Sequence, residues 1–147
     1  MRIALYQPDI PQNSGNIFRL GACFGISIDI IEPTGYIFDD KRFRRSSMDY
    51  INHIDYKRHI DWENFINWSK KNNFRLILLT TKAEKKYCDY TYKDNDILLF
   101  GRESAGVPKK VHNNVDEQIT IPMVKGQRSI NVSSAVALVV GEACRQL

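Results

Sequence analysis

The sequence predicts an α/β fold built on a mostly parallel sheet, because strand-like and helix-like segments alternate along it. Residues 74–80 (FRLILLT) are almost wholly apolar, which is typical of a strand buried on both faces of a parallel sheet. Residues 96–100 (DILLF) have the same character. A length of 147 residues without a linker-like stretch indicates one domain, residues 1–147, with helices flanking the sheet.

The N-terminal segments illustrate the alternation. Residues 2–7 have the pattern of a strand and are followed by a polar, proline-rich loop at 8–12. Asn13 or Ser14 is expected to cap a helix that ends at Gly25, where a glycine can adopt the left-handed conformation of a helix terminus. Strand and helix are therefore joined by a short polar loop, as in a βα unit.

The rest of the chain continues in the same way. The further elements are a strand at 27–32, a basic helical segment at 39–49, an ambiguous segment at 50–60 that includes a candidate strand, a helix capped by Asp61, the two apolar strands, a short strand at 118–121 and a last helix at 131–147. Strand order cannot be read from periodicity, and general experience of folds favours an unknotted path.

Composition excludes several classes of protein. The cysteines and histidines are widely spaced: Cys23, Cys88, Cys144, His53, His59 and His112. They form no CxxC pair, metal-ligand spacing or Ser-His-Asp pattern, so we expect no metal, no disulfide framework and no hydrolase of that type. Free thiols favour a reducing compartment, and no apolar run approaches the roughly 20 residues of a membrane span. We therefore expect a cytoplasmic protein.

The first candidate motif, residues 13–19 (NSGNIFR), lies where the first strand gives way to the first helix. In parallel sheets this carboxyl edge is where ligands bind, and a helix N-terminus favours an anion. Arg19, about one turn into the helix, could reach a phosphate or a ribose. The alternative is a capping turn followed by a surface arginine.

The second candidate motif, residues 98–108 (LLFGRESAGVP), is an apolar strand that runs into a loop with two glycines, Gly101 and Gly106. Such a loop lets main-chain groups approach a ligand closely. It is neither a Walker A sequence nor GxGxxG. The alternative is a tight turn before a helix that begins at Pro108.

The third candidate motif is the polar loop at 122–131 together with the last helix. Ser129 or Asn131 can cap this helix. The helix is apolar almost all round, which is typical of a helix in a core or a subunit interface. Its small residues recur every four positions, at Ser133, Ala137 and Gly141, and favour close packing.

A basic run at residues 41–45 (KRFRR) completes the set. Cations interleaved with an aromatic side chain suit a phosphate backbone with one stacked base, and they equally suit a solvated surface. The formal net charge of +4 and the isoelectric point of about 9.0 are only a mild basic bias. The four candidate RNA-binding cations are Lys41, Arg42, Arg44 and Arg45.

Taken in order, the segments IPQNSGNIFRL, LLFGRESAGVP and IPMVKGQRSINVSSAVALVVGEACRQ resemble the three signature motifs of the SPOUT-class tRNA 2'-O-ribose methyltransferases. The similarity is greatest to the minimal, single-domain wobble-position group (TrmL-like or YibK-like). IIEPTGY and LLTTKA match that group as well, so the resemblance covers nearly the whole chain.

The resemblance implies a deep C-terminal trefoil knot, S-adenosyl-L-methionine as methyl donor, and a homodimer formed through the C-terminal helix and knot region. It implies Arg19 as the catalytic residue, and Asn13, Asn16 and Arg128 as RNA-binding residues alongside the basic run. The cofactor contacts it implies are Leu79, Gly101, Glu103, Ile121, Met123, Ser129 and Ser134.

The activity implied is 2'-O-methylation of the wobble nucleotide, a cytidine or modified uridine, of tRNA, with leucine tRNAs as expected substrates. Two alternatives remain open. One is a related enzyme acting on another tRNA or rRNA site, and the other is a non-catalytic RNA-binding module. Because Arg19, Gly101, Glu103 and Ser129 are all present, the catalytic interpretation is favoured over a decayed site.

Overall fold

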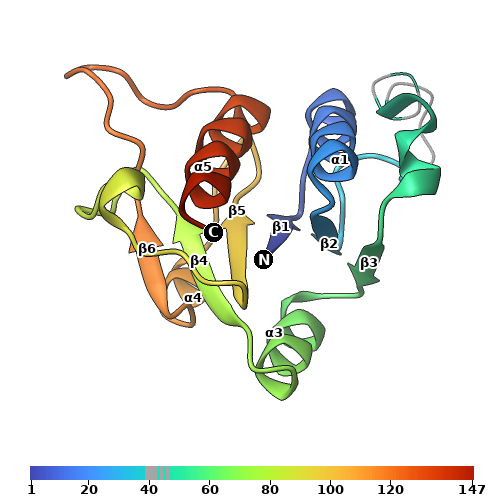
Figure 1. Ribbon diagram of the computed structural model, residues 1–147, viewed down its shortest axis with the longest axis horizontal. Helices are drawn as coiled ribbons and strands as arrows, with labels where there is room; N and C mark the ends of the chain where they lie inside the picture. The colour runs from blue at the N-terminus through green and yellow to red at the C-terminus, as the bar shows by residue number, and fades with distance from the viewer. Residues whose placement is uncertain (39–42, 44, 46) are drawn as a thin grey trace.

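A computed structural model describes residues 1–38, 43, 45 and 47–147. Within them, six strands form one sheet of order β3-β2-β1-β5-β4-β6, in which every pair of neighbours is parallel (Figure 1). The strands are β1 (Arg2–Tyr6), β2 (Ser27–Ile31), β3 (Tyr56–His59), β4 (Arg75–Leu79), β5 (Asp96–Phe100) and β6 (Glu117–Ile119). The predicted α/β class is confirmed.

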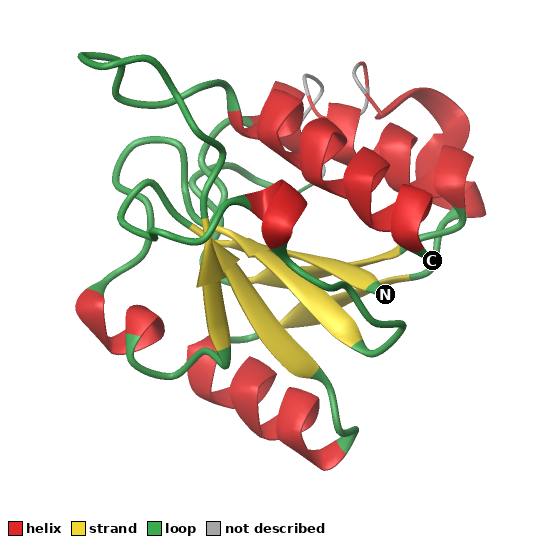
Figure 2. Ribbon diagram, turned by 60° about the vertical axis from the view of Figure 1, so that its left-hand side comes forward, coloured by secondary structure: helices red, strands yellow, loops and turns green. Residues whose placement is uncertain are grey.

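Helices cover both faces of the sheet (Figure 2). The described helices are α1 (Pro11–Phe24), α3 (Trp62–Lys71), α4 (Lys109–His112) and α5 (Val132–Gln146), with the 3₁₀ turns η1 (Met48–His53) and η2 (Tyr87–Asp89). Alternate side chains of each strand enter opposite cores. Ile3 and Leu5 of β1 pack in the core beneath α1 and α5, whereas Ala4 and Tyr6 pack in the core beneath α3 and α4.

The start of α1 differs from the prediction. The helix begins at Pro11, two residues before Asn13, and no side chain caps it. Proline suits the first helical position because its fixed φ is helical and its missing N–H has no helical partner. Asn13 and Ser14 therefore lie inside the first turn, and neither acts as the cap. The other end is confirmed, since Gly25 has φ +66°.

The caps of two other helices are confirmed. The Asp61 carboxylate accepts a hydrogen bond from the Asn64 amide (2.7 Å) at the start of α3. Asn131 caps α5, as one of the two predicted candidates. In the ambiguous stretch 50–60 only Tyr56–His59 is a strand. The basic segment predicted at 39–49 lies largely outside the described residues.

The strand order reverses direction within the sheet. From β1 the chain proceeds outward to β2 and β3, whereas from β5 it proceeds past β4 to β6, in the opposite direction. The chain therefore leaves β1 and β5 toward opposite edges of the sheet, and this reversal of strand order marks the place on the carboxyl edge where ligands bind in open α/β sheets. No helix in the described part of the chain is long and apolar enough to cross a membrane.

Candidate active site

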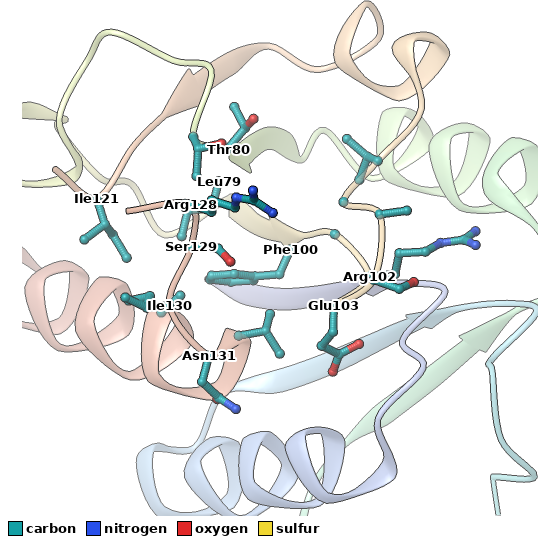
Figure 3. A pocket seen from close by; sticks show the side chains of 18 of the residues that line it. Leu79, Thr80, Phe100, Arg102, Glu103, Ile121, Arg128, Ser129, Ile130 and Asn131 are labelled. Atoms are coloured by element: carbon teal, nitrogen blue, oxygen red, sulfur yellow. The ribbon is translucent and has the colours of Figure 1, made fainter. Parts of the chain in front are cut away.

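A cavity of about 540 Å³ lies at the carboxyl ends of β4, β5 and β6. Its walls include residues 79–82, 100–107 and 128–132. Figure 3 shows Ser129 and Ile130 on one side, Arg102 and Glu103 on the other, and the Phe100 ring between them. A volume of this size suits a ligand of nucleoside dimensions.

The loop after β5 is closed on itself by main-chain contacts. The Gly106 amide donates to the Arg102 carbonyl (2.8 Å), and the Arg102 amide donates to the Gly106 carbonyl (3.2 Å). Gly106 has φ +63°, and a Cβ on Gly101 would lie only 2.6 Å from the Gly106 carbonyl carbon. Both glycines are therefore required for the tight wall that this loop forms, the first by space and the second by backbone conformation.

Polar side chains join this loop to the starts of α1 and α5. The Asn13 amide nitrogen donates to Glu103 Oε1 (3.0 Å), and the Asn131 amide nitrogen donates to Asn13 Oδ1 (2.9 Å). Glu103 Oε2 accepts from the Asp9 main-chain amide (3.0 Å), and Asp9 Oδ1 accepts from the Glu103 main-chain amide (3.1 Å). Residues 90 or more positions apart in the sequence are thus hydrogen-bonded to one another directly.

The two carboxyl groups of this cluster are perturbed in opposite directions. Burial, reinforced by the nearby Asp9 carboxylate, raises the pKa of Glu103 above its ordinary value. The pKa of Asp9 is lowered, through its hydrogen bonding with Glu103 first and then with Ser104. Asp9 therefore remains ionised at a lower pH than Glu103.

Six of the seven predicted cofactor residues line the cavity: Leu79, Gly101, Glu103, Ile121, Met123 and Ser129. Ser134 does not line it, and lies exposed in the first turn of α5. Phe100, Asn131 and Asp9 were not singled out for the site. Asp9 follows the first strand, so the rule that polar residues at carboxyl ends bind ligands could have identified it.

The predicted catalytic and RNA-binding residues are distributed differently. Asn13 and Arg128 line the cavity, but Asn13 is buried, with 5% of its surface exposed. Asn16 and Arg19 lie on the exposed face of α1 and do not line it. The Arg19 guanidinium carbon lies 5.5 Å from the centre of the Tyr50 ring. A single chain therefore does not bring Arg19 into the cavity.

The basic run is described only in part. Arg45 is helical and exposed, whereas Lys41, Arg42 and Arg44 lie outside the described residues. Among the residues that the structure does describe, no group of three or more His, Cys, Asp or Glu side chains could hold a metal ion.

A parallel sheet with a glycine-walled cavity at its carboxyl edge is the arrangement with which open α/β proteins bind small ligands. Residues 1–141 match the SpoU rRNA Methylase family, and the chain belongs to this family. The predicted resemblance to this class of methyltransferase is confirmed.

Individual relatives give a more specific comparison than the family as a whole. The chain is 49% identical to a tRNA (cytidine(34)-2'-O)-methyltransferase of Beijerinckia indica subsp. indica, over 99% of this chain and 91% of that protein. A solved structure described as "Structural insights into the 2-OH methylation of C/U34 on tRNA" superposes with a TM-score of 0.94 at 32% identity, covering 99% of this chain and 94% of that one. An rRNA methyltransferase of Sinorhizobium meliloti with AdoMet bound has a TM-score of 0.91 at 26% identity, over 99% of this chain and 56% of that one.

Proposed function

We propose that this protein methylates the ribose 2'-hydroxyl of nucleotide 34, a cytidine or modified uridine, in cytoplasmic tRNA, with leucine tRNAs as substrates. The observation that carries the proposal is the cavity lined by residues of all three motifs, in a chain of the SpoU family. Residues 1–147 act as one SPOUT domain, whose C-terminal loops form a trefoil knot around the cavity.

The cavity fits S-adenosyl-L-methionine. Phe100, Leu79 and Ile121 offer apolar surface to an adenine ring, and the glycine loop admits close main-chain approach. Ser129 and Met123 border the same space. When bound, the cofactor supplies a methyl group already activated on a sulfonium, so no metal is needed to polarise it.

The acceptor needs more help than the donor. A ribose hydroxyl is a weak nucleophile at neutral pH, so the protein must align its oxygen with the methyl carbon and ease loss of its proton. Arg19 is the residue for this task. A guanidinium is a poor base because it is permanently protonated in proteins, so the role of Arg19 is to stabilise the developing alkoxide or to hold a neighbouring phosphate.

A homodimer completes this site. Arg19 lies outside the cavity of its own chain, so a second copy that brings its α1 against α5 would supply it. On α5, Ala137, Leu138 and Gly141 form an exposed stripe, and a Cβ on Gly141 would meet no atom within 4 Å. The small-residue face therefore does not pack within the described part of the chain, and is available to a partner.

The dimer predicts the effect of one substitution on α5. Leu138 is 46% exposed, and Leu138→Asp should weaken dimerisation by about a hundredfold, because an unpaired carboxylate would enter an apolar contact twice in a symmetric dimer. Sedimentation velocity measures it, with Ile60→Asp as control, since Ile60 is 76% exposed beyond the end of β3. An unchanged dimer would place the interface elsewhere.

The basic run predicts a salt effect. Neutralising two of its cations, as in Arg44→Gln with Arg45→Gln, should lower the slope of log affinity for tRNA against log salt by about 1.5, because two phosphate contacts are lost. Cofactor affinity should not change. Lys70→Gln with Lys71→Gln, at the far end of α3, removes the same charge as a control. Equal slopes in the wild type and the Arg44/Arg45 variant would exclude this run from the RNA surface.

Transfer of labelled methyl from S-adenosyl-L-methionine to tRNA lacking methylation at nucleotide 34, followed by nuclease mapping, tests the proposal. Label confined to nucleotide 34 supports it. Since the family description and the Sinorhizobium meliloti relative both refer to rRNA, rRNA is the second substrate to assay. Label on rRNA alone would retain the chemistry and replace the substrate. Cofactor binding without transfer to either RNA would indicate a binding module.

A further inference from the structure

In the polar cluster beside the cavity, the direction of each hydrogen bond is fixed by its neighbours. The proposed methyl transfer does not by itself require this arrangement. We propose that Asp9, Asn13 and Glu103 are positioning residues. Together with Asn131 they form a chain of hydrogen bonds in which each side-chain amide can donate in only one direction. This chain holds the start of α1 against the glycine loop after β5 and the start of α5. The inference rests on the proposed function, because it assigns these residues a role in assembling that site. It also has a test that does not depend on activity.

The direction is set at α5. Asn131 Oδ1 accepts hydrogen bonds from the main-chain amides of Ser133 (2.8 Å) and Ser134 (3.3 Å). This cap fixes which end of the Asn131 amide is oxygen, because helix N-termini present only donors. The amide nitrogen of Asn131 must therefore point the other way, where it donates to Asn13 Oδ1 (2.9 Å).

The side-chain amide of Asn13 is oriented by Asn131 in the same way. With its oxygen occupied by Asn131, its nitrogen faces Glu103 Oε1 at 3.0 Å. Asn13 is 5% exposed, so solvent offers little replacement for either partner. The Asp9 main-chain amide donates to the second Glu103 oxygen. Both donors therefore end at Glu103, because an ionised carboxylate can only accept hydrogen bonds.

Asp9 in turn holds the loop that carries Glu103, the residue at which the chain of hydrogen bonds ends. Its Oδ1 accepts from the Glu103 main-chain amide (3.1 Å), and its Oδ2 accepts from the Ser104 hydroxyl. The segment after β1 and the glycine loop after β5 therefore clasp each other through both side chains and main chain. Figure 3 shows the side chains of Glu103 and Asn131 both directed toward α1, away from the space between Phe100 and Ser129.

The chain has a consequence for the reaction. Asn13 is six positions before Arg19 on the same helix, so whatever fixes Asn13 also fixes where α1 presents its exposed face. The carboxylate of Glu103 is committed to donors from α1 and from the segment before it. Glu103 therefore acts through these contacts, and its carboxylate need not touch the cofactor.

Reversing the polarity tests the chain. Glu103→Gln places an amide NH₂ opposite either the Asn13 nitrogen or the Asp9 amide, so two donors meet. Asn13→Asp places a second carboxylate against Glu103, so two acceptors meet. In the double variant the new carboxylate at position 13 accepts from Asn131 and from the new amide at position 103, whose oxygen accepts from Asp9. Shape is conserved throughout. Each single substitution changes hydrogen-bond direction and the net charge by one, and the double variant restores the net charge.

We expect each single substitution to lower kcat by about tenfold to a hundredfold, as for a buried polar group left unpaired. The double variant should return to within about fivefold of the wild type. Melting temperatures should follow the same order. Asn16→Asp combined with Glu103→Gln is the matched control, because Asn16 lies on the exposed face of α1, and this pair should show no recovery.

If the loss of kcat in the double variant equals the product of the two single losses, and its fall in melting temperature equals their sum, the chain would be overturned. The proposed function fails separately. If the wild type methylates no RNA, the four melting temperatures still decide whether positions 13 and 103 are coupled. Recovery of melting temperature without recovery of kcat would also overturn the proposal, because the coupling would then be structural only.

Discussion

Arg19→Ala is expected to lower kcat for methyl transfer by at least about a hundredfold while leaving cofactor affinity unchanged, because removal of one group that stabilises developing charge costs about that much. Arg19 is exposed on α1 and outside the cavity, so truncation creates no core void and removes no cavity wall. Single-turnover kinetics with saturating tRNA, together with calorimetry for the cofactor, measures the two quantities.

Arg19→Lys is the matched control for charge. If the planar guanidinium matters, lysine should restore little of the rate, because it cannot offer two parallel donors to an oxyanion or a phosphate. A rate within about threefold of the wild type, which corresponds to less than about 1 kcal/mol of transition-state stabilisation, together with an unshifted pH profile, would contradict a specific role for the guanidinium.

Mixed dimers reveal which subunit supplies Arg19. When Arg19→Ala chains are mixed equally with chains that cannot bind cofactor, a partner-supplied arginine leaves one intact site in each mixed dimer, which is about a quarter of wild-type activity after random exchange. An arginine acting on its own chain's cavity leaves none. The single-chain geometry predicts the first outcome.

Gly101→Ala is the second large effect. The new Cβ would lie 2.6 Å, 2.8 Å and 3.0 Å from the carbonyl carbon, Cα and carbonyl oxygen of Gly106, which are main-chain atoms and cannot rotate away. The loop must open and lose its Arg102–Gly106 hydrogen bonds. We expect cofactor affinity to fall about tenfold to a hundredfold and stability to fall by about 1–3 kcal/mol.

Gly106→Ala separates a clash from backbone strain in the same loop. A Cβ there meets nothing within 4 Å, but φ is +63°. The cost should be about 1–2 kcal/mol of stability, the penalty for an ordinary residue in the left-handed region, with a smaller loss of affinity. Cofactor affinity in Gly101→Ala equal to that of the wild type would show that this wall is not part of the binding site.

Local sequence patterns predicted much of the sheet because burial on both faces leaves a direct signature. The strand predicted at 96–100 is β5 with the same bounds, and 74–80 contains β4 within one residue at each end. The start of α1 was misplaced for a tertiary reason. Asn13 has the chemistry of a cap, but its amide bonds to Glu103 and Asn131, which are about 90 and 118 positions away.

For the site, as for the fold, the sequence indicated some residues and missed others that tertiary contacts define. The family resemblance implied seven cofactor residues, and six of them line the cavity, while their contact with a cofactor stays a prediction. The position of Asp9 after the first strand could have marked it as a candidate, but no local pattern reports its contact with Glu103, which is 94 positions away. Periodicity also could not show that Arg19 lies on the exposed face of α1 and not in the cavity of its own chain.

The most direct test of the central claim compares two anticodon stem-loops that differ by one atom. One carries ribose at nucleotide 34 and the other carries 2'-deoxyribose there, with all other nucleotides identical. We expect labelled methyl to enter the first and not the second, with both binding equally. Equal labelling of the two, or labelling of neither alongside tight cofactor binding, would contradict transfer to the 2'-hydroxyl of nucleotide 34.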